Sequence, residues 1–208
     1  MESPICPSGT RLIETLKWDG EKLVRRDRHL ARLRASAMTL GFVIDEAALA
    51  AALASIGGTE PLRVRLTLGM DGGTKITSAP LGTNASEWRV TLAEERLSSH
   101  NPFLRHKTTQ RNLYDQTRAA LPGGMDEAIF ANERGEICEG TITSVFFDFG
   151  QGLATPPLRC GCLPGILRAE MLESGICHEA VIHLKDLHRA KLWVGNSLRG
   201  LIPARTKP

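Results

Sequence analysis

The sequence predicts an α+β protein of two domains, and three features support this fold class. Apolar and polar residues alternate along 61–70, PLRVRLTLGM, as in a half-buried β-strand. Residues 26–42, RDRHLARLRASAMTLGF, place apolar side chains at helical spacing and reach a helix-ending glycine at Gly41. Strand-like and helix-like segments also mix through the second half of the chain, which contains no internal repeat.

The first elements of the chain have recognisable boundaries. Residues 11–18 are expected to form a strand, and the DGEK turn at 19–22 closes it into a hairpin. Asp45 is the expected N-cap of a second helix over 46–56, which the next two glycines end. These elements predict a sheet covered by helices in the N-terminal part.

The boundary between the two domains is expected near residue 102. Residues 75–80 and 88–95 continue the first sheet as an antiparallel meander, and the polar stretch 97–106 has the composition of a linker. The sequence therefore predicts a small N-terminal α+β domain over 1–102 and a C-terminal domain over 103–208.

The second half is expected to alternate helices and short strands. A helix over 108–121 ends at a Pro-Gly-Gly sequence, and another over 164–175 begins at Pro-Gly. The intervening and closing segments are expected to be strands and turns: 126–132, 133–141, 144–149, 153–158 and 191–204.

Composition excludes several classes of function. The 42% hydrophobic content is typical of a globular protein, and a net charge of +3 is too small to indicate nucleic-acid binding. No apolar run approaches the roughly 20 residues that cross a bilayer, and the N-terminus lacks the pattern of a secretion signal. Five cysteines, an odd number, argue against a disulfide framework, and the Cys160-Gly-Cys162 spacing is too tight for structural zinc. A cytoplasmic protein without a metal site is expected.

Lys107 is the first candidate for chemistry. It lies in the polar stretch FLRHKTTQRNLYD, 103–115, where a solvated surface charge is the ordinary interpretation. The alternative is an amine that condenses with a carbonyl, and a position beside a domain boundary favours a ligand site. Spacing alone does not decide between the two.

Four other features are further candidates for ligand binding. The CLPGILR segment, 162–168, begins a helix whose backbone N–H groups at Ile166 and Leu167 favour phosphate. Glu139 stands between apolar runs, and a buried carboxylate there requires a cation, a donor or solvent. Arg32 lies on the polar side of the first helix, and the 195–200 turn, GNSLRG, supplies a hydroxyl and a guanidinium. A plain helix start, a surface glutamate, a solvated helix face and a capping turn are the alternatives.

The ordered set of these motifs resembles a known family. RHLARLRASA, HKTTQR, ICEGTITSVFF, LATPPL, CLPGILR and GNSLRG occur in the order found in the fold-type IV pyridoxal-phosphate enzymes, also called class IV aminotransferases. The similarity extends from about residue 12 to residue 203. It implies the two-domain fold of D-amino acid aminotransferase-like enzymes, pyridoxal 5'-phosphate as the cofactor and a homodimer.

The resemblance also implies a role for each matched residue. Lys107 would bind the cofactor covalently and transfer protons, and Glu139 would pair with the pyridine nitrogen. The residues that would hold the cofactor phosphate are Arg32, the backbone amides of Ile166 and Leu167, and the hydroxyl of Ser197. Leu167 replaces a threonine found in many aminotransferases.

Departures from the family pattern bear on the substrate. Asn112 stands where many aminotransferases carry a tyrosine against the cofactor's ring hydroxyl, and Tyr114 is a substitute candidate. Ser144 replaces an asparagine, and the N-terminal domain is short. Thr15 and Arg199 are the candidate substrate contacts, with Arg199 facing a carboxylate.

Three functions follow as alternatives. The compact HKTTQR and NSLRG segments favour a lyase that converts 4-amino-4-deoxychorismate to 4-aminobenzoate and pyruvate, a step of the folate branch. A class IV aminotransferase of the branched-chain or D-amino acid type would use the same cofactor site. A non-catalytic protein that binds phosphorylated metabolites would need neither Lys107 nor the covalent bond.

Overall fold

The computed structural model describes residues 6–83 and 85–206, and these residues divide into two compact units. Unit 1 contains residues up to 83 together with His106–Gln110. Unit 2 contains the described residues 85–105 and 111–206. No helix among the described residues is long and apolar enough to cross a membrane.

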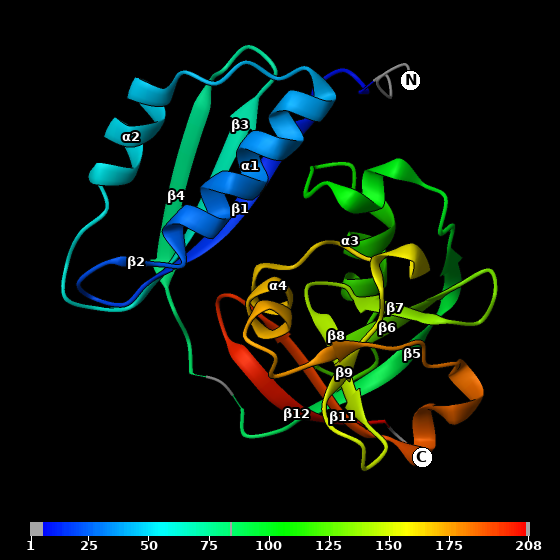
Figure 1. Ribbon diagram of the computed structural model, residues 1–208. Helices are drawn as coiled ribbons and strands as arrows, with labels where there is room; N and C mark the ends of the chain where they lie inside the picture. Colours follow the sequence, from blue (N-terminus) through cyan, green and yellow to red (C-terminus); the bar gives the residue numbers. More distant parts are fainter. Residues whose placement is uncertain (1–5, 84, 207–208) are drawn as a thin grey trace. The chain divides into compact units, whose positions relative to one another are not determined.

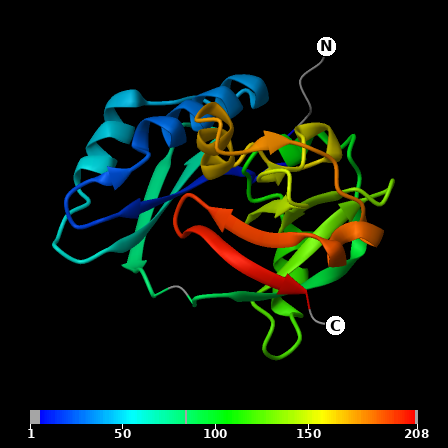
Figure 2. The same cartoon turned by 60° about the horizontal axis from the view of Figure 1, so that its bottom comes forward.

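Unit 1 is a four-stranded antiparallel sheet with two helices on one face (Figure 1). Its strand order is β2-β1-β3-β4, and Figure 2 shows the helices on the same side of these strands. The elements are β1 (Arg11–Trp18), β2 (Leu23–Val24), α1 (Arg26–Leu40), α2 (Glu46–Ala54), β3 (Leu62–Gly69) and β4 (Thr74–Pro80).

Local signals in unit 1 act as predicted. The Asp19 carboxylate accepts the N–H groups of Glu21 and Lys22 and thereby closes the β1–β2 hairpin. Asp45 caps α2 by accepting the N–H of Ala48 at 2.9 Å. Gly41 ends α1 at φ 74°, which a glycine adopts without steric cost.

Unit 2 contains a sheet that closes into a barrel. Its strand order is β10-β9-β8-β11-β12-β5-β6-β7, and an additional β7–β8 pairing joins the last strand back to the third. The interior is filled by buried apolar residues, including Val90, Ile129, Val145 and Val194. Closure covers the free edge of β7, while β10 remains at an edge, and it places Glu139 of β7 opposite Ser144 of β8.

The elements of unit 2 have these bounds: β5 (Trp88–Leu97), η1 (Pro102–Arg105), α3 (Asn112–Ala119), β6 (Glu127–Asn132), β7 (Ile137–Gly140), β8 (Ser144–Asp148), β9 (Ala154–Thr155), η2 (Leu158–Cys160), α4 (Ile166–Glu173), β10 (His178–Glu179), η3 (Leu184–Arg189), β11 (Lys191–Asn196) and β12 (Gly200–Thr206). β11 and β12 form the hairpin drawn in orange and red in Figures 1 and 2.

The strand predicted over 88–95 belongs to the second sheet, not to an N-terminal meander. β5 pairs in parallel with β6 and with β12, whereas β4 pairs antiparallel with β3 as expected. The expectation for 88–95 was wrong because alternation shows that a strand is half-buried but does not identify its partner. A boundary near residue 102 consequently falls inside unit 2.

The helix predicted over 108–121 is shorter than expected, since α3 begins at Asn112. The preceding residues are extended along β1: Thr109 donates its N–H to the Arg11 carbonyl at 2.9 Å, and Leu12 and Thr108 form a β-bridge. These hydrogen bonds to a strand distant in sequence override the local helical tendency of the segment.

Candidate functional site

The predicted site residues divide between the two units. Thr15, Arg32 and Lys107 belong to unit 1, and Glu139, Ile166, Leu167, Ser197 and Arg199 belong to unit 2. Each group is described here within its own unit.

Lys107 is held by its backbone against β1. Its carbonyl accepts the N–H of Ile13 at 2.7 Å, and two residues later the Thr109 hydroxyl accepts the N–H of Arg11 at 2.9 Å. The Gln110 amide donates to the Thr10 hydroxyl at 2.8 Å. Lys107 is half-buried, so the fully solvated charge that composition favours does not describe it.

The histidine before this lysine is also fixed within unit 1. His106 Nδ1 lies 3.0 Å from the Ser36 hydroxyl of α1. Burial lowers the pKa of His106 below its usual value, so a neutral imidazole is expected at neutral pH. The segment that carries Lys107 is therefore anchored both to a strand and to a helix.

Arg32 pairs with a buried glutamate that the sequence analysis did not single out. Glu14 of β1 is 1% exposed, and its two oxygens accept Arg32 Nε at 2.9 Å and Nη2 at 2.6 Å. His29 Nδ1 lies 2.6 Å from the same carboxylate. Burial opposes ionisation of Glu14, but the Arg32 charge and the two hydrogen-bonding partners outweigh it and lower the pKa of Glu14. Its place between Leu12 and Leu16 in the alternating strand was the available signal.

Thr15 follows Glu14 in β1 and pairs with Arg65 of β3. Successive side chains of a strand point to opposite faces, so Thr15 lies on the face away from the Glu14–Arg32 pair. The substrate role of Thr15 therefore stays a prediction without support from its neighbours in unit 1.

Glu139 lies in β7 and receives two hydrogen bonds within unit 2. The Tyr114 hydroxyl donates to its Oε1 at 2.7 Å, and the Leu163 backbone N–H donates to its Oε2 at 3.0 Å. Only 7% of the surface of Glu139 is exposed to solvent. A carboxylate with a donor on each oxygen is held in a fixed orientation and can accept a hydrogen bond from a proton-bearing ring nitrogen.

Glu139 is connected to the predicted phosphate site by one row of paired residues across the sheet. Glu139 pairs with Ser144, and Ser144 pairs with Gly195 across β8 and β11. A Cβ on Gly165, which precedes α4, would lie 2.5 Å from the Ser144 hydroxyl oxygen. Glycine at 165 therefore allows the start of α4 to approach the strand beside Glu139.

The start of α4 has the properties of an anion site. Gly165 is its N-cap, and no side-chain hydrogen bond to the cap is found among the described residues. Because the first N–H groups of a helix have no intrahelical acceptor, those of Ile166 and Leu167 suit an anion. The buried Arg168 anchors the helix by donating from Nη2 to the Pro156 carbonyl at 2.9 Å.

The turn that carries Ser197 adjoins α4. A Cβ on Gly195 would lie 2.9 Å from Leu167 Cδ2, so the strand that leads into the turn packs directly on the helix. The turn itself is closed by Asn196, whose Oδ1 accepts the N–H groups of Leu198 at 3.1 Å and Arg199 at 3.0 Å. The structure thus assembles Leu167 and the 196–199 turn in one place.

Arg199 has a neighbour that sequence did not predict. Its guanidinium carbon lies 5.7 Å from the centre of the Trp88 ring in β5. A cation over an indole face is stabilised by the ring electrons. This contact gives Arg199 a structural role within unit 2, and its contact with a substrate carboxylate stays a prediction.

Glu127 is a second buried carboxylate that sequence reasoning missed. It is fully buried, and its oxygens accept the N–H groups of Thr141 at 3.0 Å and Ile142 at 3.1 Å and the Thr143 hydroxyl at 2.9 Å. The Asn196 amide then donates to the Ile142 carbonyl at 3.2 Å. Glu127 therefore shapes the turn after Glu139 and, through that turn, supports the Ser197 segment.

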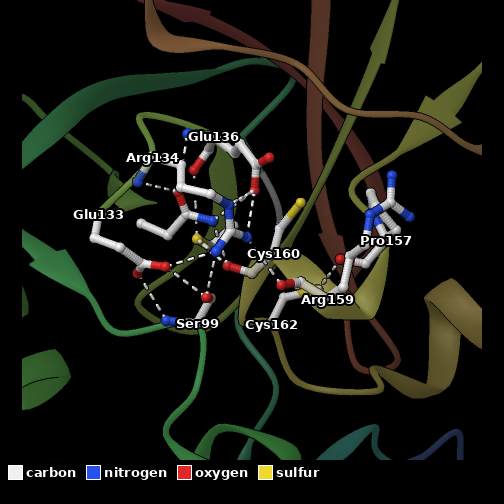
Figure 3. Close-up of polar contacts among 10 residues, drawn as sticks. Ser99, Glu133, Arg134, Glu136, Pro157, Arg159, Cys160 and Cys162 are labelled. Carbon is white, nitrogen blue, oxygen red and sulfur yellow. Dashed lines mark hydrogen bonds and ion pairs between the residues drawn. The ribbon is translucent and has the colours of Figure 1, made fainter.

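A polar network fixes the loop that supplies the Leu163 N–H (Figure 3). The Asn132 amide donates to the Cys160 carbonyl at 3.0 Å, and Arg134 Nη2 donates to the Arg159 carbonyl at 3.2 Å. Both acceptors lie just before Leu163 in the chain. The hairpin between β6 and β7 thereby holds the loop that contacts Glu139.

The same network concentrates charge around Arg134. Figure 3 shows this arginine between Glu133 and Glu136, which it contacts at 2.6 and 2.7 Å. Hydrogen bonds from Arg134 and Asn132 lower the pKa of Glu136 to about 2, and those from Ser99 lower the pKa of Glu133 to about 2. Both carboxylates are therefore ionised at neutral pH.

The cysteines are not positioned as nucleophiles. All five are free thiols. Burial raises the pKa of Cys160 to about 11 and that of Cys162 to about 12, so both stay protonated near neutral pH. A protonated, buried thiol is a weak nucleophile and a poor metal ligand.

The groups of unit 2 fit pyridoxal phosphate. Glu139 offers an oriented carboxylate for a protonated pyridine nitrogen, and the uncapped start of α4 offers N–H donors for a phosphate. The segment before α4 links the two, because Leu163 contacts Glu139 and Gly165 begins the helix.

Comparison with known proteins gives consistent results. The sequence profile of the family described as amino-transferase class IV matches residues 11–206. The chain is 30% identical over 181 residues to a Schizosaccharomyces pombe protein named "Putative aminodeoxychorismate lyase", covering 82% of this chain and 76% of that protein.

Two solved structures show the same fold. A protein from Mesorhizobium loti described as a "Putative amino-acid aminotransferase" superposes with a TM-score of 0.88 at 48% identity, covering 95% of this chain and 100% of that chain. The 4-amino-4-deoxychorismate lyase of Pseudomonas aeruginosa superposes with a TM-score of 0.81 at 22% identity, covering 96% of this chain and 83% of that chain.

Proposed function

Because the chain belongs to the class IV aminotransferase family, we propose that it binds pyridoxal 5'-phosphate and converts 4-amino-4-deoxychorismate to 4-aminobenzoate and pyruvate. The main support for this cofactor is the position of Glu139 beside the start of α4. Its two oxygens accept hydrogen bonds from the Tyr114 hydroxyl and the Leu163 N–H. The similarity to the S. pombe protein over 82% of this chain supports the lyase reaction.

Each residue group has a defined task in this proposal. Pyridoxal phosphate supplies an electron sink next to the substrate's amino group when it is bound. The Glu139 carboxylate keeps a proton on the pyridine nitrogen, since an ionised acceptor stabilises the charged ring. The N–H groups of Ile166 and Leu167 and the Ser197 hydroxyl bind the phosphate, and Arg32 contributes its positive charge.

Lys107 carries the proton transfer. Its Nζ would hold the cofactor covalently and, as a free amine, would accept and return a proton at the substrate carbons. The hydrogen bonds that hold 106–110 on β1 fix the backbone from which this amine extends. In this scheme Thr15 and Arg199 contact the substrate, and the active protein is a cytoplasmic homodimer.

Product analysis tests the lyase proposal. Purified protein loaded with pyridoxal phosphate is incubated with 4-amino-4-deoxychorismate and no 2-oxo acid acceptor. We expect equal amounts of 4-aminobenzoate and pyruvate, and we expect Lys107→Ala to abolish both. Loaded protein that forms neither product is not this lyase.

An aminotransferase is the second candidate, because the M. loti protein with 48% identity is described as an amino-acid aminotransferase. In that case an amino acid would lose its amino group only when a 2-oxo acid is added. Branched-chain and D-amino acids with 2-oxoglutarate or pyruvate as acceptor distinguish it from the lyase. Protein that binds phosphorylated metabolites but takes up no pyridoxal phosphate would instead be the non-catalytic binder.

A further inference from the structure

We propose that Tyr114 is a positioning residue for Glu139, and that its hydroxyl sets how strongly the protein binds the protonated ring nitrogen of pyridoxal phosphate. This inference rests on the proposed function, since it concerns the same cofactor. It assigns to Tyr114 a task at the ring nitrogen, whereas sequence comparison made it a candidate for the ring hydroxyl.

The Tyr114 ring packs against two neighbours. In α3 it meets Phe130 of β6 edge-on, with ring centres 5.1 Å apart and planes at 65°. The Arg111 guanidinium carbon lies 5.6 Å from the centre of its ring, and Arg111 is itself tied to the Thr141 carbonyl at 3.0 Å. Packing by an aromatic edge and a cation leaves the phenol oxygen one direction to point.

That direction is the Glu139 carboxylate. The hydroxyl donates to Oε1 at 2.7 Å while the Leu163 N–H takes Oε2 at 3.0 Å. An ionised carboxylate has roughly four acceptor positions, and these two bonds, one on each oxygen, set its plane. One donor comes from a helix and the other from the loop before α4, so the carboxylate is held from two elements.

The phenol is protonated at neutral pH and is therefore a hydrogen-bond donor there. Burial, and then the negative charge of Glu139, raise the pKa of the Tyr114 hydroxyl far above its ordinary value. A donor to a carboxylate stabilises the ionised form of that carboxylate. Tyr114 thus favours the charge state of Glu139 that a protonated pyridine requires.

Affinity for two cofactor forms tests the inference. Protein stripped of cofactor is titrated with pyridoxal phosphate and with its 1-deaza analogue, which has C–H in place of the ring nitrogen. Loss of a hydrogen bond to a charged group predicts about tenfold weaker pyridoxal phosphate binding for Tyr114→Phe. Binding of the analogue should change by less than about twofold, because it offers Glu139 no proton.

Two variants serve as controls. Thr117→Val removes a hydroxyl from the same helix and should alter neither affinity. In a Glu139→Gln background, Tyr114→Phe should have less than about a twofold further effect, because the two residues act through one interaction.

The outcomes separate the two proposals. Wild-type protein that takes up neither ligand refutes the proposed function itself. If the wild type binds pyridoxal phosphate and Tyr114→Phe binds it equally well, only the role of Tyr114 is wrong. An equal loss for both ligands, or full additivity with Glu139→Gln, also contradicts that role, since the hydroxyl would then act on the pocket in general.

Discussion

Gly165 lies so close to Ser144 that a side chain on residue 165 would require the Ser144 hydroxyl to move. A Cβ there would lie 2.5 Å from the Ser144 hydroxyl oxygen. Ser144 pairs with Glu139 in the sheet. The close approach of Gly165 to Ser144 therefore brings the start of α4 next to the strand pair that contains the Glu139 carboxylate. The absence of a side chain at Gly165 therefore lets the start of α4, the predicted phosphate site, lie close to the strand pair that contains Glu139.

Gly165→Ala should weaken cofactor binding. Overpacking of this size costs about 1–3 kcal/mol, so we expect roughly a tenfold loss of pyridoxal phosphate affinity. Ser144→Ala removes the oxygen and should restore most of that loss in the double variant. Gly123→Ala, where no atom lies within 4 Å of the added methyl, is the matched control. No rescue by Ser144→Ala would contradict the contact as the cause.

Glu127→Gln should destabilise unit 2. The amide of glutamine would direct N–H groups at the donors of Thr141, Ile142 and Thr143, all of which the carboxylate now satisfies. We expect a loss of about 3 kcal/mol in the free energy of unfolding, measured by urea denaturation. Glu94→Gln, on the exposed side of β5, should change it by less than about 0.5 kcal/mol. Equal effects would show that the buried network contributes little.

Arg32→Ala should destabilise the protein even without cofactor. It leaves the carboxylate of Glu14, which is 1% exposed, without its bidentate partner, and such a loss costs about 3–5 kcal/mol. The same change at Arg34, whose pair with Glu46 is exposed, should cost less than about 1 kcal/mol. Comparison of both variants by thermal unfolding separates this role from phosphate binding; similar losses would refute it.

Acid unfolding should report on Glu136. The pKa of its carboxyl is about 2 in the folded protein against 4.5 for an unperturbed glutamate, so its contribution to stability is complete above about pH 4.5. That contribution is lost as the pH falls from about 4.5 toward 2. Over this range Glu136 binds a proton in the unfolded chain but stays ionised in the folded protein. Between these values the stability of Glu136→Gln should depend less steeply on pH, by about one proton. Parallel curves would mean that the Arg134 contact does not shift this carboxyl.

Sequence patterns predicted the elements of unit 1 well because the determinants are local. The Asp19 turn, the Asp45 cap and the Gly41 terminus each act within a few residues. The strand over 88–95 was found but assigned to the wrong sheet, and the helix start at 108 was wrong, because the partners of these segments, β6, β12 and β1, are distant in the chain. Local propensity carries no information about such pairing.

The site residues also divide into those that sequence motifs identify and those that depend on contacts distant in the chain. The family motifs named Glu139 and the start of α4, and the structure places these groups beside one another through Leu163 and Ser144. The supporting residues Glu14 and Glu127 were missed, because a buried carboxylate with donors has the same letter in the sequence as a surface one. For Glu14, its place between Leu12 and Leu16 in an alternating strand indicated burial, but only the fold shows which donors hold these carboxylates.

The central claim is that Lys107 is the residue to which pyridoxal phosphate binds. Protein loaded with the cofactor is reduced with borohydride, digested and analysed by peptide mass spectrometry. We expect the visible absorption of the bound cofactor to disappear and the pyridoxyl mass to be found on the peptide containing Lys107. Lys107→Ala should carry no such label. Label on another lysine, or none on loaded wild-type protein, would contradict it.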